Sequence, residues 1–171
     1  MRRVRYEVAA TLDGYIAGPK GEADWIIMDP DIDFGDIFDQ FDTVLVGRRT
    51  FEIMHQGGQG DDSRMKTYVF SRTLKQSDYP KVTIVADNPA ETVKKLKRQK
   101  GKDIWLFGGG LLFRSLAELG LVDAVGVAIV PILLGRGIPL LPPPGPRVKL
   151  KLKEHKIYPK TGIVGLEYHV A

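Results

Sequence analysis

The sequence predicts a single α/β domain, residues 1–171, with a mostly parallel central sheet, flanking helices and a C-terminal antiparallel hairpin. Short apolar runs of strand length alternate with amphipathic helical segments as far as Gly120, a pattern typical of a parallel sheet covered by helices. Beyond Gly120 only strands and loops are expected. The C-terminal strands follow a proline-rich stretch and are too short to fold alone, so they are expected to join the main sheet.

Eight segments have the length and residue pattern of strands. The last two flank the sequence YPKTG, which predicts the turn of an antiparallel hairpin. In the seventh segment leucines and a valine alternate with lysines, which predicts a half-buried strand with one solvated face. The segments are residues 4–10, 43–47, 67–71, 82–86, 103–107, 124–130, 148–157 and 163–170.

Three helical segments follow from apolar spacing and from terminal signals. The first is indicated by one apolar stripe at i, i+3, i+4 and i+7, formed by Phe34, Ile37, Phe38 and Phe41. The second begins at Pro89, with Asn88 as its cap and Glu91 completing a capping box. The third places Leu112, Leu116 and Leu119 on one face, and Gly120 closes it.

Composition excludes several classes of protein. A hydrophobic content of 43% indicates a folded globular chain, and no apolar run reaches the about 18 residues of a membrane span. The charged N-terminus is unlike a signal peptide, so the cytoplasm is the expected location. The chain has no cysteine and its histidines lack metal-ligand spacing, so no metal is expected. Although the net charge is +4, the lysine clusters carry no interleaved aromatic residues, and nucleic-acid binding is not expected.

Four loops that follow strands contain the candidate functional residues, as expected for ligand sites in open α/β sheets. The first, residues 10–25, is long and rich in glycine, which fits either a surface loop or a lid over a substrate. The second contains Gly47, two arginines and Thr50, and the third contains Ser71 and Arg72. Guanidinium and hydroxyl groups at these positions suit a phosphate, although a solvated arginine pair beside a capping threonine is the simpler interpretation of the second loop.

The fourth loop contains three consecutive glycines, Gly108 to Gly110, between a strand and a helix. Neither common phosphate-binding fingerprint fits, because Phe113 stands where G-x-G-x-x-G requires glycine and no G-x-x-x-x-G-K-[ST] exists in the chain. Free N–H groups at a helix start still favour an anion such as a pyrophosphate. A purely structural turn is the alternative.

The order of these loops resembles the dihydrofolate reductase-like fold. The resemblance is closest to the reductase domain of bifunctional riboflavin-biosynthesis deaminase-reductases and their stand-alone relatives. It rests on segments within residues 8–141: TLDGYIAG, VGRRTFE, YVFSRTL, LFGGGLLFRSLAELGLVD and VPILLGRGIPLL. Two departures are evident, because the deaminase half is missing and Ala124 stands where the family commonly has glutamate.

The resemblance implies an NADPH site assembled from the four loops. Backbone near the end of the first strand would hold the nicotinamide, the Gly-Arg-x-Thr segment and the glycine turn would hold the phosphates, and the third loop would line the adenine–ribose side. The residues, in that order, are Ala9, Ile16 and Ala17; Gly47, Arg48, Arg49 and Thr50; Gly108, Gly109, Gly110, Leu111 and Leu112; and Ser71 and Arg72. A preference for NADPH over NADH is expected, because the extra phosphate suits the arginines at the strand ends.

The substrate is less well specified than the cofactor. Asp31 and Asp33 precede the first helix and could face the cleft. In dihydrofolate reductases an acid at the start of this helix binds the pterin ring, and the resemblance implies Asp31, which lies at a comparable distance before Gly47. Asp13 and Trp25 are candidate substrate contacts. The leading activity is reduction of a pyrimidine ribosylamine phosphate in riboflavin synthesis; the alternatives are reduction of a pterin or dihydrofolate, and a non-catalytic NADP-binding protein. Because the relatives commonly associate, a homodimer is expected, with a small-molecule substrate and no nucleic-acid or membrane partner.

Overall fold

The computed structural model describes residues 1–58 and 64–171. In these residues the chain forms, in order, β1 (Val4–Thr11), β2 (Tyr15–Ala17), α1 (Phe34–Phe38), β3 (Phe41–Gly47), α2 (Arg48–Gln56), β4 (Lys66–Phe70), the 3₁₀ helix η1 (Gln76–Asp78), β5 (Thr83–Val85), α3 (Pro89–Arg98), β6 (Asp103–Gly108), α4 (Gly110–Glu118), β7 (Ala124–Val130), β8 (Ile138–Pro139), β9 (Leu150–Tyr158) and β10 (Ile163–Val170).

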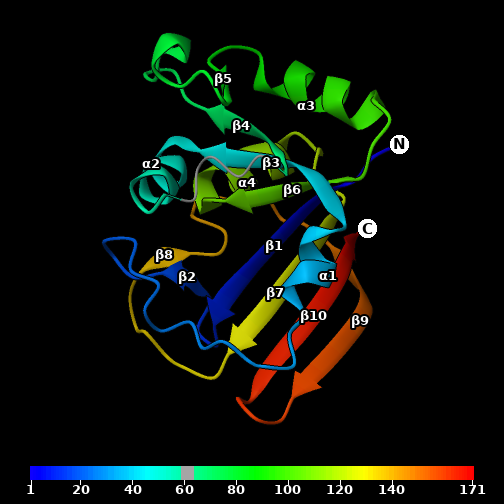
Figure 1. Cartoon of the computed structure of the whole chain (residues 1–171). Helices are drawn as coiled ribbons and strands as arrows, with labels where there is room; N and C mark the ends of the chain where they lie inside the picture. The colour runs from blue at the N-terminus through cyan, green and yellow to red at the C-terminus, as the bar shows by residue number, and fades with distance from the viewer. Residues whose placement is uncertain (59–63) are drawn as a thin grey trace.

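Eight of these strands form one sheet in the order β5-β4-β3-β6-β1-β7-β10-β9 (Figure 1). All pairs from β5 to β7 are parallel, whereas β10 is antiparallel to both β7 and β9. β2 and β8 form a separate two-stranded antiparallel sheet. The predicted α/β fold, with its parallel sheet and its C-terminal hairpin, is therefore confirmed.

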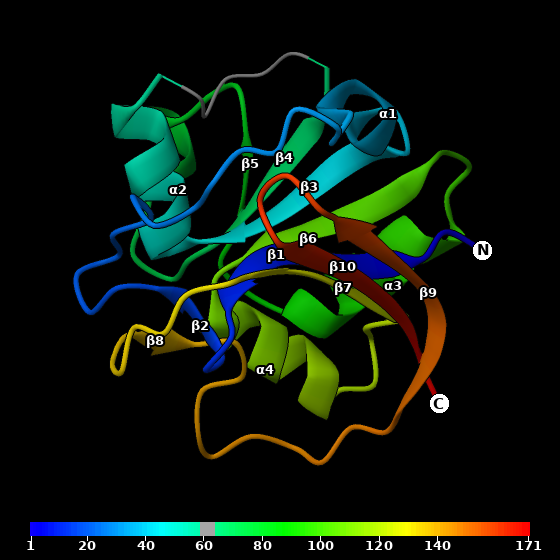
Figure 2. The same cartoon turned by 90° about the horizontal axis from the view of Figure 1, so that it is seen from below.

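Helices cover both sides of the sheet. Figure 2 shows α1 and α2 on one side and α4 on the other. Alternation along the strands explains the two layers, since Ile104 and Leu106 of β6 pack with α3 and α4 whereas Trp105 and Phe107 pack on the side of α2. The larger core cluster includes Tyr6 of β1, whose ring stacks on Phe113 of α4 at 4.0 Å between centroids.

Two local predictions were wrong for identifiable reasons. Phe41 was expected on the stripe of the first helix, but α1 ends at Phe38 and Phe41 begins β3, where its buried ring stacks on Trp105 at 5.6 Å. Asn88 does precede α3, but its backbone is left-handed (φ 49°, ψ 53°) and its side chain makes no capping bond. Its expected partner Glu91 instead accepts a hydrogen bond from Lys94 at 3.2 Å, so no capping box forms.

The strand predicted to be half buried is exposed in the single chain. β9 forms the edge of the sheet, where Figure 1 shows it far from α2, α3 and α4. Its apolar residues Leu150, Leu152 and Ile157 are 43%, 50% and 62% exposed. The alternating pattern therefore identified a strand with an apolar face that nothing in the described chain covers.

Candidate functional site

The carboxyl ends of β1, β3 and β6 meet at one edge of the sheet, because these strands are parallel neighbours. α2 starts directly after β3, at Arg48, and α4 starts at Gly110, two residues after β6 ends. Two helix N-termini therefore lie at the same edge as the end of β1. This edge is where the sequence predicted a ligand site.

A split between β1 and β6 opens the sheet at that edge. β1 pairs with β6 only from Val4 to Tyr6, although it pairs with β7 as far as Thr11. The main-chain carbonyl of Arg3 accepts a hydrogen bond from the Ile104 N–H. Because backbone groups alternate in direction along a strand, the odd-numbered residues of β1 point their N–H and C=O groups toward β6. Beyond Tyr6 the Glu7 carbonyl accepts from the Trp105 indole at 3.2 Å. The next odd residue, Ala9, therefore presents its N–H and C=O to the split, where no partner for them is found in the described chain.

The ends of β3 and β6 approach each other through glycines. A Cβ placed on Gly47 would lie 3.8 Å from both the Gly108 oxygen and the Gly109 nitrogen, and one on Gly109 would lie 3.3 Å from the Thr50 hydroxyl. The peptide between Gly108 and Gly109 is cis. Neither α2 nor α4 has a side-chain N-cap bond, so side chains do not occupy the first N–H groups of these helices. The geometry offers main-chain donors from two helices to one anion.

The three consecutive glycines have different structural reasons. Gly108 has a φ of +141°, and a Cβ there would meet nothing within 4 Å, so this position is open. A Cβ on Gly110 would lie 2.8 Å from both the Pro139 oxygen and the Pro142 ring. Gly110 is therefore required for packing against the proline-rich segment, and the cofactor contact expected of it stays a prediction.

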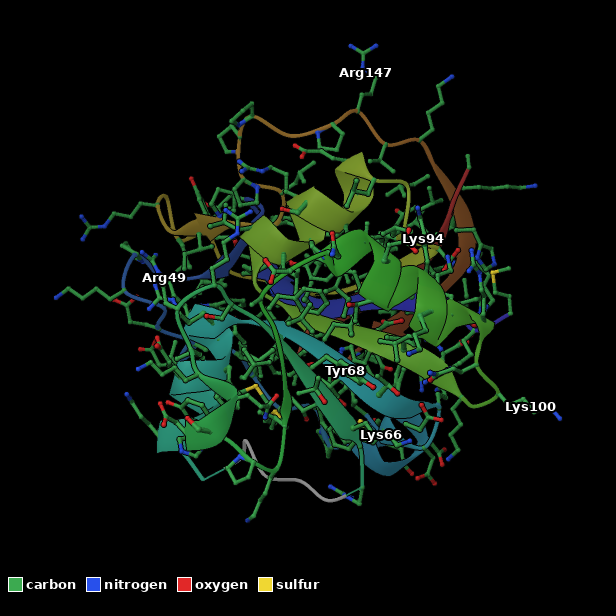
Figure 3. All side chains as sticks on the ribbon, turned by 90° about the horizontal axis from the view of Figure 1, so that it is seen from above. Arg49, Lys66, Tyr68, Lys94, Lys100 and Arg147 are labelled. Atoms are coloured by element: carbon green, nitrogen blue, oxygen red, sulfur yellow. The ribbon has the colours of Figure 1, made fainter. Side chains whose placement is uncertain are left out.

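The predicted cationic and hydroxyl groups gather around the same edge. Arg48, Arg49 and Arg72 are all exposed, and Arg48 pairs with Glu52 at 3.4 Å. Figure 3 shows Arg49 at the start of α2. Because Gly47 is in register with Phe70, the next residue of that loop, Ser71, lies beside the start of α2.

Ser71 itself is buried, and its hydroxyl is engaged within its own loop. The oxygen accepts hydrogen bonds from the N–H groups of Thr73 and Leu74 at 3.2 and 3.1 Å. This local turn fixes the backbone from which Arg72 projects. Leu111 is 57% exposed and Leu112 is half-buried at the opening of α4, so the predicted cofactor residues after the glycines are within reach of this edge.

The loop after β1 is held in place by β8 and by the segment that follows β7. Tyr15 and Ala17 of β2 pair with β8, and Ile16 lies between them. The Asp13 carboxylate accepts hydrogen bonds from the Thr11 hydroxyl at 2.6 Å and from the N–H groups of Leu134 and Gly135 at 3.2 and 2.7 Å. These bonds, that from Thr11 foremost, hold the pKa of Asp13 below its usual value. The loop is thus a braced element, and the substrate contact proposed for Asp13 stays a prediction.

The remaining predicted residues lie on the segment that leads to α1. Trp25 is 8% exposed, packs with Val130 and Ile163, and donates its indole N–H to the Glu22 carbonyl at 3.2 Å. Asp31 is exposed and pairs with Lys160 of the β9–β10 turn at 2.8 Å. Neither contact excludes a ligand, and the assigned roles of Trp25 and Asp31 stay predictions.

Asp33, the other acid considered for the cleft, caps α1 by accepting the Asp36 N–H at 3.0 Å. Asp29 was not singled out from the sequence, yet its carboxylate is buried. It accepts from the Thr161 hydroxyl at 2.6 Å and from the Asp31 N–H at 2.8 Å, which ties the segment before α1 to the hairpin turn. Only its place at the start of the acidic run DPDID could have drawn attention to it.

Arg5 and Glu7 were also missed. Both lie in the middle of β1 on the side of α1, and the Arg5 Nε donates to a Glu7 oxygen at 2.9 Å. Two opposite charges within the buried strand pattern VRYEV were the available signal.

Comparison with known proteins agrees with the resemblance drawn from the loops. The family model described as the RibD C-terminal domain matches residues 2–164. The uncharacterized protein YyaP of Bacillus subtilis is 40% identical, with 98% of this chain and 95% of YyaP covered.

Two solved structures share the fold. A Shewanella sp. PV-4 protein provisionally named for riboflavin biosynthesis superposes with a TM-score of 0.83 and 23% identity, covering 100% of this chain and 99% of that one. A dihydrofolate reductase from Enterococcus faecalis, solved with NADP(H), superposes with a TM-score of 0.71 and 16% identity, covering 98% and 96%.

Two further findings concern the described residues alone. No helix in residues 1–58 and 64–171 is long and apolar enough to cross a membrane. The same residues contain no group of three or more histidine, aspartate or glutamate side chains arranged to hold a metal ion.

The Asp29–Thr161 contact predicts a pH-dependent loss of stability. The bond from Thr161 holds the pKa of Asp29 below its usual value, so its stabilising effect is present above the unfolded carboxyl pKa of about 3.9 and is lost as pH falls through the lower folded value. Asp29→Asn is expected to lower the urea midpoint at pH 7, and its difference from the wild type should shrink below about pH 4. The matched control is Asp24→Asn, at an exposed acid nearby. Equal midpoints at pH 7 would contradict the assignment.

Proposed function

The chain belongs to the RibD C-terminal domain family, and from this we propose that it is an NADPH-dependent reductase whose cofactor lies in the split between β1 and β6. The observation that carries the proposal is the free backbone amide of Ala9 beside two helix starts that lack side-chain caps. Family membership and the fold support a reductase of the riboflavin-biosynthesis type.

The residues at the site suit each part of a nicotinamide dinucleotide. Ala9, with Ile16 and Ala17 across the braced loop, offers backbone groups for the carboxamide. The helix starts at Gly47–Thr50 and Gly108–Leu112 would take the phosphates on main-chain N–H groups. Ser71 and Arg72 would line the adenosine. When bound, NADPH supplies a hydride, and the protein orients the ring and excludes water from it.

The leading substrate is a pyrimidine ribosylamine phosphate of the kind reduced in riboflavin synthesis, and the alternative is a pterin or dihydrofolate. The position where the family commonly has glutamate is Ala124, fully buried and in register with Arg5, so substrate contacts near this position differ from the family pattern. A non-catalytic NADP-binding protein is the competing class.

Turnover separates these possibilities. We expect the purified protein to oxidise NADPH in the presence of the pyrimidine ribosylamine phosphate, monitored at the NADPH absorbance band, with dihydrofolate as the second substrate. Tight NADPH binding without oxidation by either compound would favour the non-catalytic reading. Absence of NADPH binding would refute the proposed function altogether.

The exposed arginines predict the cofactor preference. Arg49→Ala and Arg72→Ala should each weaken NADPH binding by about 1.5–3 kcal/mol, the range for hydrogen bonds to charged groups, because each removes a guanidinium from the 2′-phosphate. NADH binding should be nearly unchanged. Arg147→Ala is the control, since this exposed arginine lies far from Arg49 (Figure 3). Titration calorimetry showing equal losses for both cofactors would place the 2′-phosphate elsewhere.

We also propose that the protein is a homodimer formed through the apolar face of the β9–β10 hairpin. Leu150 and Leu152 are in register with Val170 and Tyr168, and Val170 packs against the larger core cluster, so this face lies on the α3/α4 side of the sheet. Lys153 pairs with Glu167 on the opposite side at 2.9 Å. A mainly apolar face, on which His155 also lies, suits an identical face of a second copy, since a twofold contact pairs each patch with itself.

Edge-to-edge pairing of β9 is less favourable than this face-to-face contact. Lysines recur along the strand, and its register with β10 shifts between Glu167 and Tyr168. Charged side chains and bulges are features that prevent sheet edges from pairing with other chains.

The dimer proposal predicts the effect of a charge on that face. Leu152→Lys and Ile157→Lys should convert the protein to a monomer in light scattering at micromolar concentration, because each would bury an unpaired ammonium group. Leu133→Lys is the control, at a residue that is 68% exposed outside the hairpin. A wild-type monomer, or dimers that survive both hairpin substitutions, would refute this interface.

A further inference from the structure

An ion pair lies in the middle of the sheet, and the proposed cofactor site does not include it. Arg5 and Glu7 are on the α1 side of β1, with side chains 8% and 20% exposed. Taking two charges out of water is costly, so a buried pair is weak evidence for stability and invites a functional explanation. The two side chains also differ in how many of their polar atoms have hydrogen-bond partners.

Arg5 is fully engaged. Its Nε and one terminal nitrogen contact a single oxygen of Glu7 at 2.9 and 2.8 Å, and the other terminal nitrogen donates to Gln40 at 2.7 Å. The guanidinium also lies 4.8 Å above the Phe41 ring. Arg5 is therefore a fixed anchor for one Glu7 oxygen.

The second oxygen of Glu7 has no partner among the described residues. It occupies the space over Gly126 of β7, and a Cβ at that position would collide with the carboxylate. Gly126 thus gives the carboxyl group room to lie across the sheet. Arg5 holds one oxygen of the Glu7 carboxyl group, and the second oxygen is left for a ligand.

The surroundings of Glu7 connect it to the proposed cofactor site. Glu7 and Ala9 point to the same side of β1 and are two residues apart, roughly 7 Å along the strand. On the neighbouring strand the rings of Trp105 and Phe107 lie 5.0 Å apart, and Phe38 of α1 lies 5.4 Å from Trp105. These rings lie over β6, on one side of β1, and the Glu7 carboxyl group lies over Gly126 of β7 on the other side. The arrangement suits a flat heterocycle that packs on the rings and turns a polar edge toward the carboxyl group.

We propose that Glu7 is the acid of the substrate site, which binds the heteroatom of a C=N or C=O group on a flat heterocyclic substrate and protonates it. The inference rests on the proposed reductase function. Hydride from NADPH enters the carbon and supplies both electrons, while the O–H bond of the Glu7 carboxyl breaks and its proton forms the new N–H or O–H bond. The carboxylate that remains regains a proton from water.

The electrostatic environment is consistent with this role. Burial raises the pKa of Glu7, and so does Glu167 of β10, whereas Arg5 and Lys153 of β9 lower it, with a net rise. Asp103 of β6 lies 3.7 Å from a terminal nitrogen of Arg5. Asp31, the acid expected from the sequence, instead lies at the exposed rim in an ion pair with Lys160. The raised pKa favours the protonated form of the Glu7 carboxyl, which a general acid requires.

The test compares Glu7→Gln with Glu167→Gln, an acid of equal 20% side-chain exposure on the same side of the sheet. Glu7→Gln keeps the size of the side chain and an oxygen for Arg5, and it should lower kcat about 100-fold, the lower range for loss of an acid–base group. It should also abolish the fall in kcat as pH rises through the Glu7 pKa. Glu167→Gln should retain activity and the fall in kcat with rising pH, but the fall should move to lower pH because the Glu167 charge raises the Glu7 pKa. Gly126→Ala, which displaces the carboxylate, should resemble Glu7→Gln.

An activity-independent measurement uses protein labelled with ¹³C at glutamate carboxyl carbons, with the Glu7 signal assigned by its loss in Glu7→Gln. Addition of NADP⁺ followed by 2,4-diaminopyrimidine should shift the Glu7 resonance and leave that of Glu167 in place. If NADPH binds but the Glu7 resonance and the turnover of Glu7→Gln are unchanged, the inference fails and the proposed function stands. If the wild type does not bind NADPH, the proposed function fails and the role of Glu7 fails with it.

Discussion

The early end of the pairing between β1 and β6 is the constraint on which the rest of the site depends. Two parallel strands that separate leave backbone groups without partners, and such groups must find others because burying them unpaired is costly. The Trp105 indole satisfies the Glu7 carbonyl, and the amide of Ala9 is left facing the gap. The glycine contacts between β3 and β6 then bring the starts of α2 and α4 to the same gap.

Much of the chain outside the sheet serves to hold that gap in shape. Asp13 joins the loop after β1 to the segment after β7, and Asp29 joins the segment before α1 to the β9–β10 turn. Both carboxylates bond to groups far away in sequence. Asp13 extends the pairing of β1 and β7 into their loops, whereas Asp29 connects two segments that the sheet does not pair. Asp13 and Asp29 thus stabilise the loops around the gap. Glu7, an acid inside a strand, is the one proposed to act on the substrate.

The sequence specified the sheet more fully than the loops, for a physical reason. Strands such as β7 and β10 matched their predicted bounds. Runs rich in β-branched residues, with apolar side chains on the buried face, are a local sequence signal of a strand in a sheet. Phe41 and Asn88 were misassigned because their roles depend on tertiary contacts and on a left-handed backbone that no local pattern reveals. The proximity of Gly47, Thr50, Ser71 and Gly109 was predictable, because the loops that contain them follow parallel strands whose carboxyl ends meet at one edge of the sheet. The Glu7–Gly126 contact was not, since it joins residues more than a hundred positions apart.

The contact between Gly110 and the Pro139 carbonyl has a consequence for how such a chain can vary. A helix start pressed against the backbone of another segment cannot accept any side chain unless that segment retreats. The retreat would move β8 and, through its pairing, β2 as well. Changes in the proline-rich segment and at the opening of α4 are therefore coupled, and a designer who wishes to widen the proposed cofactor site has to rebuild both together.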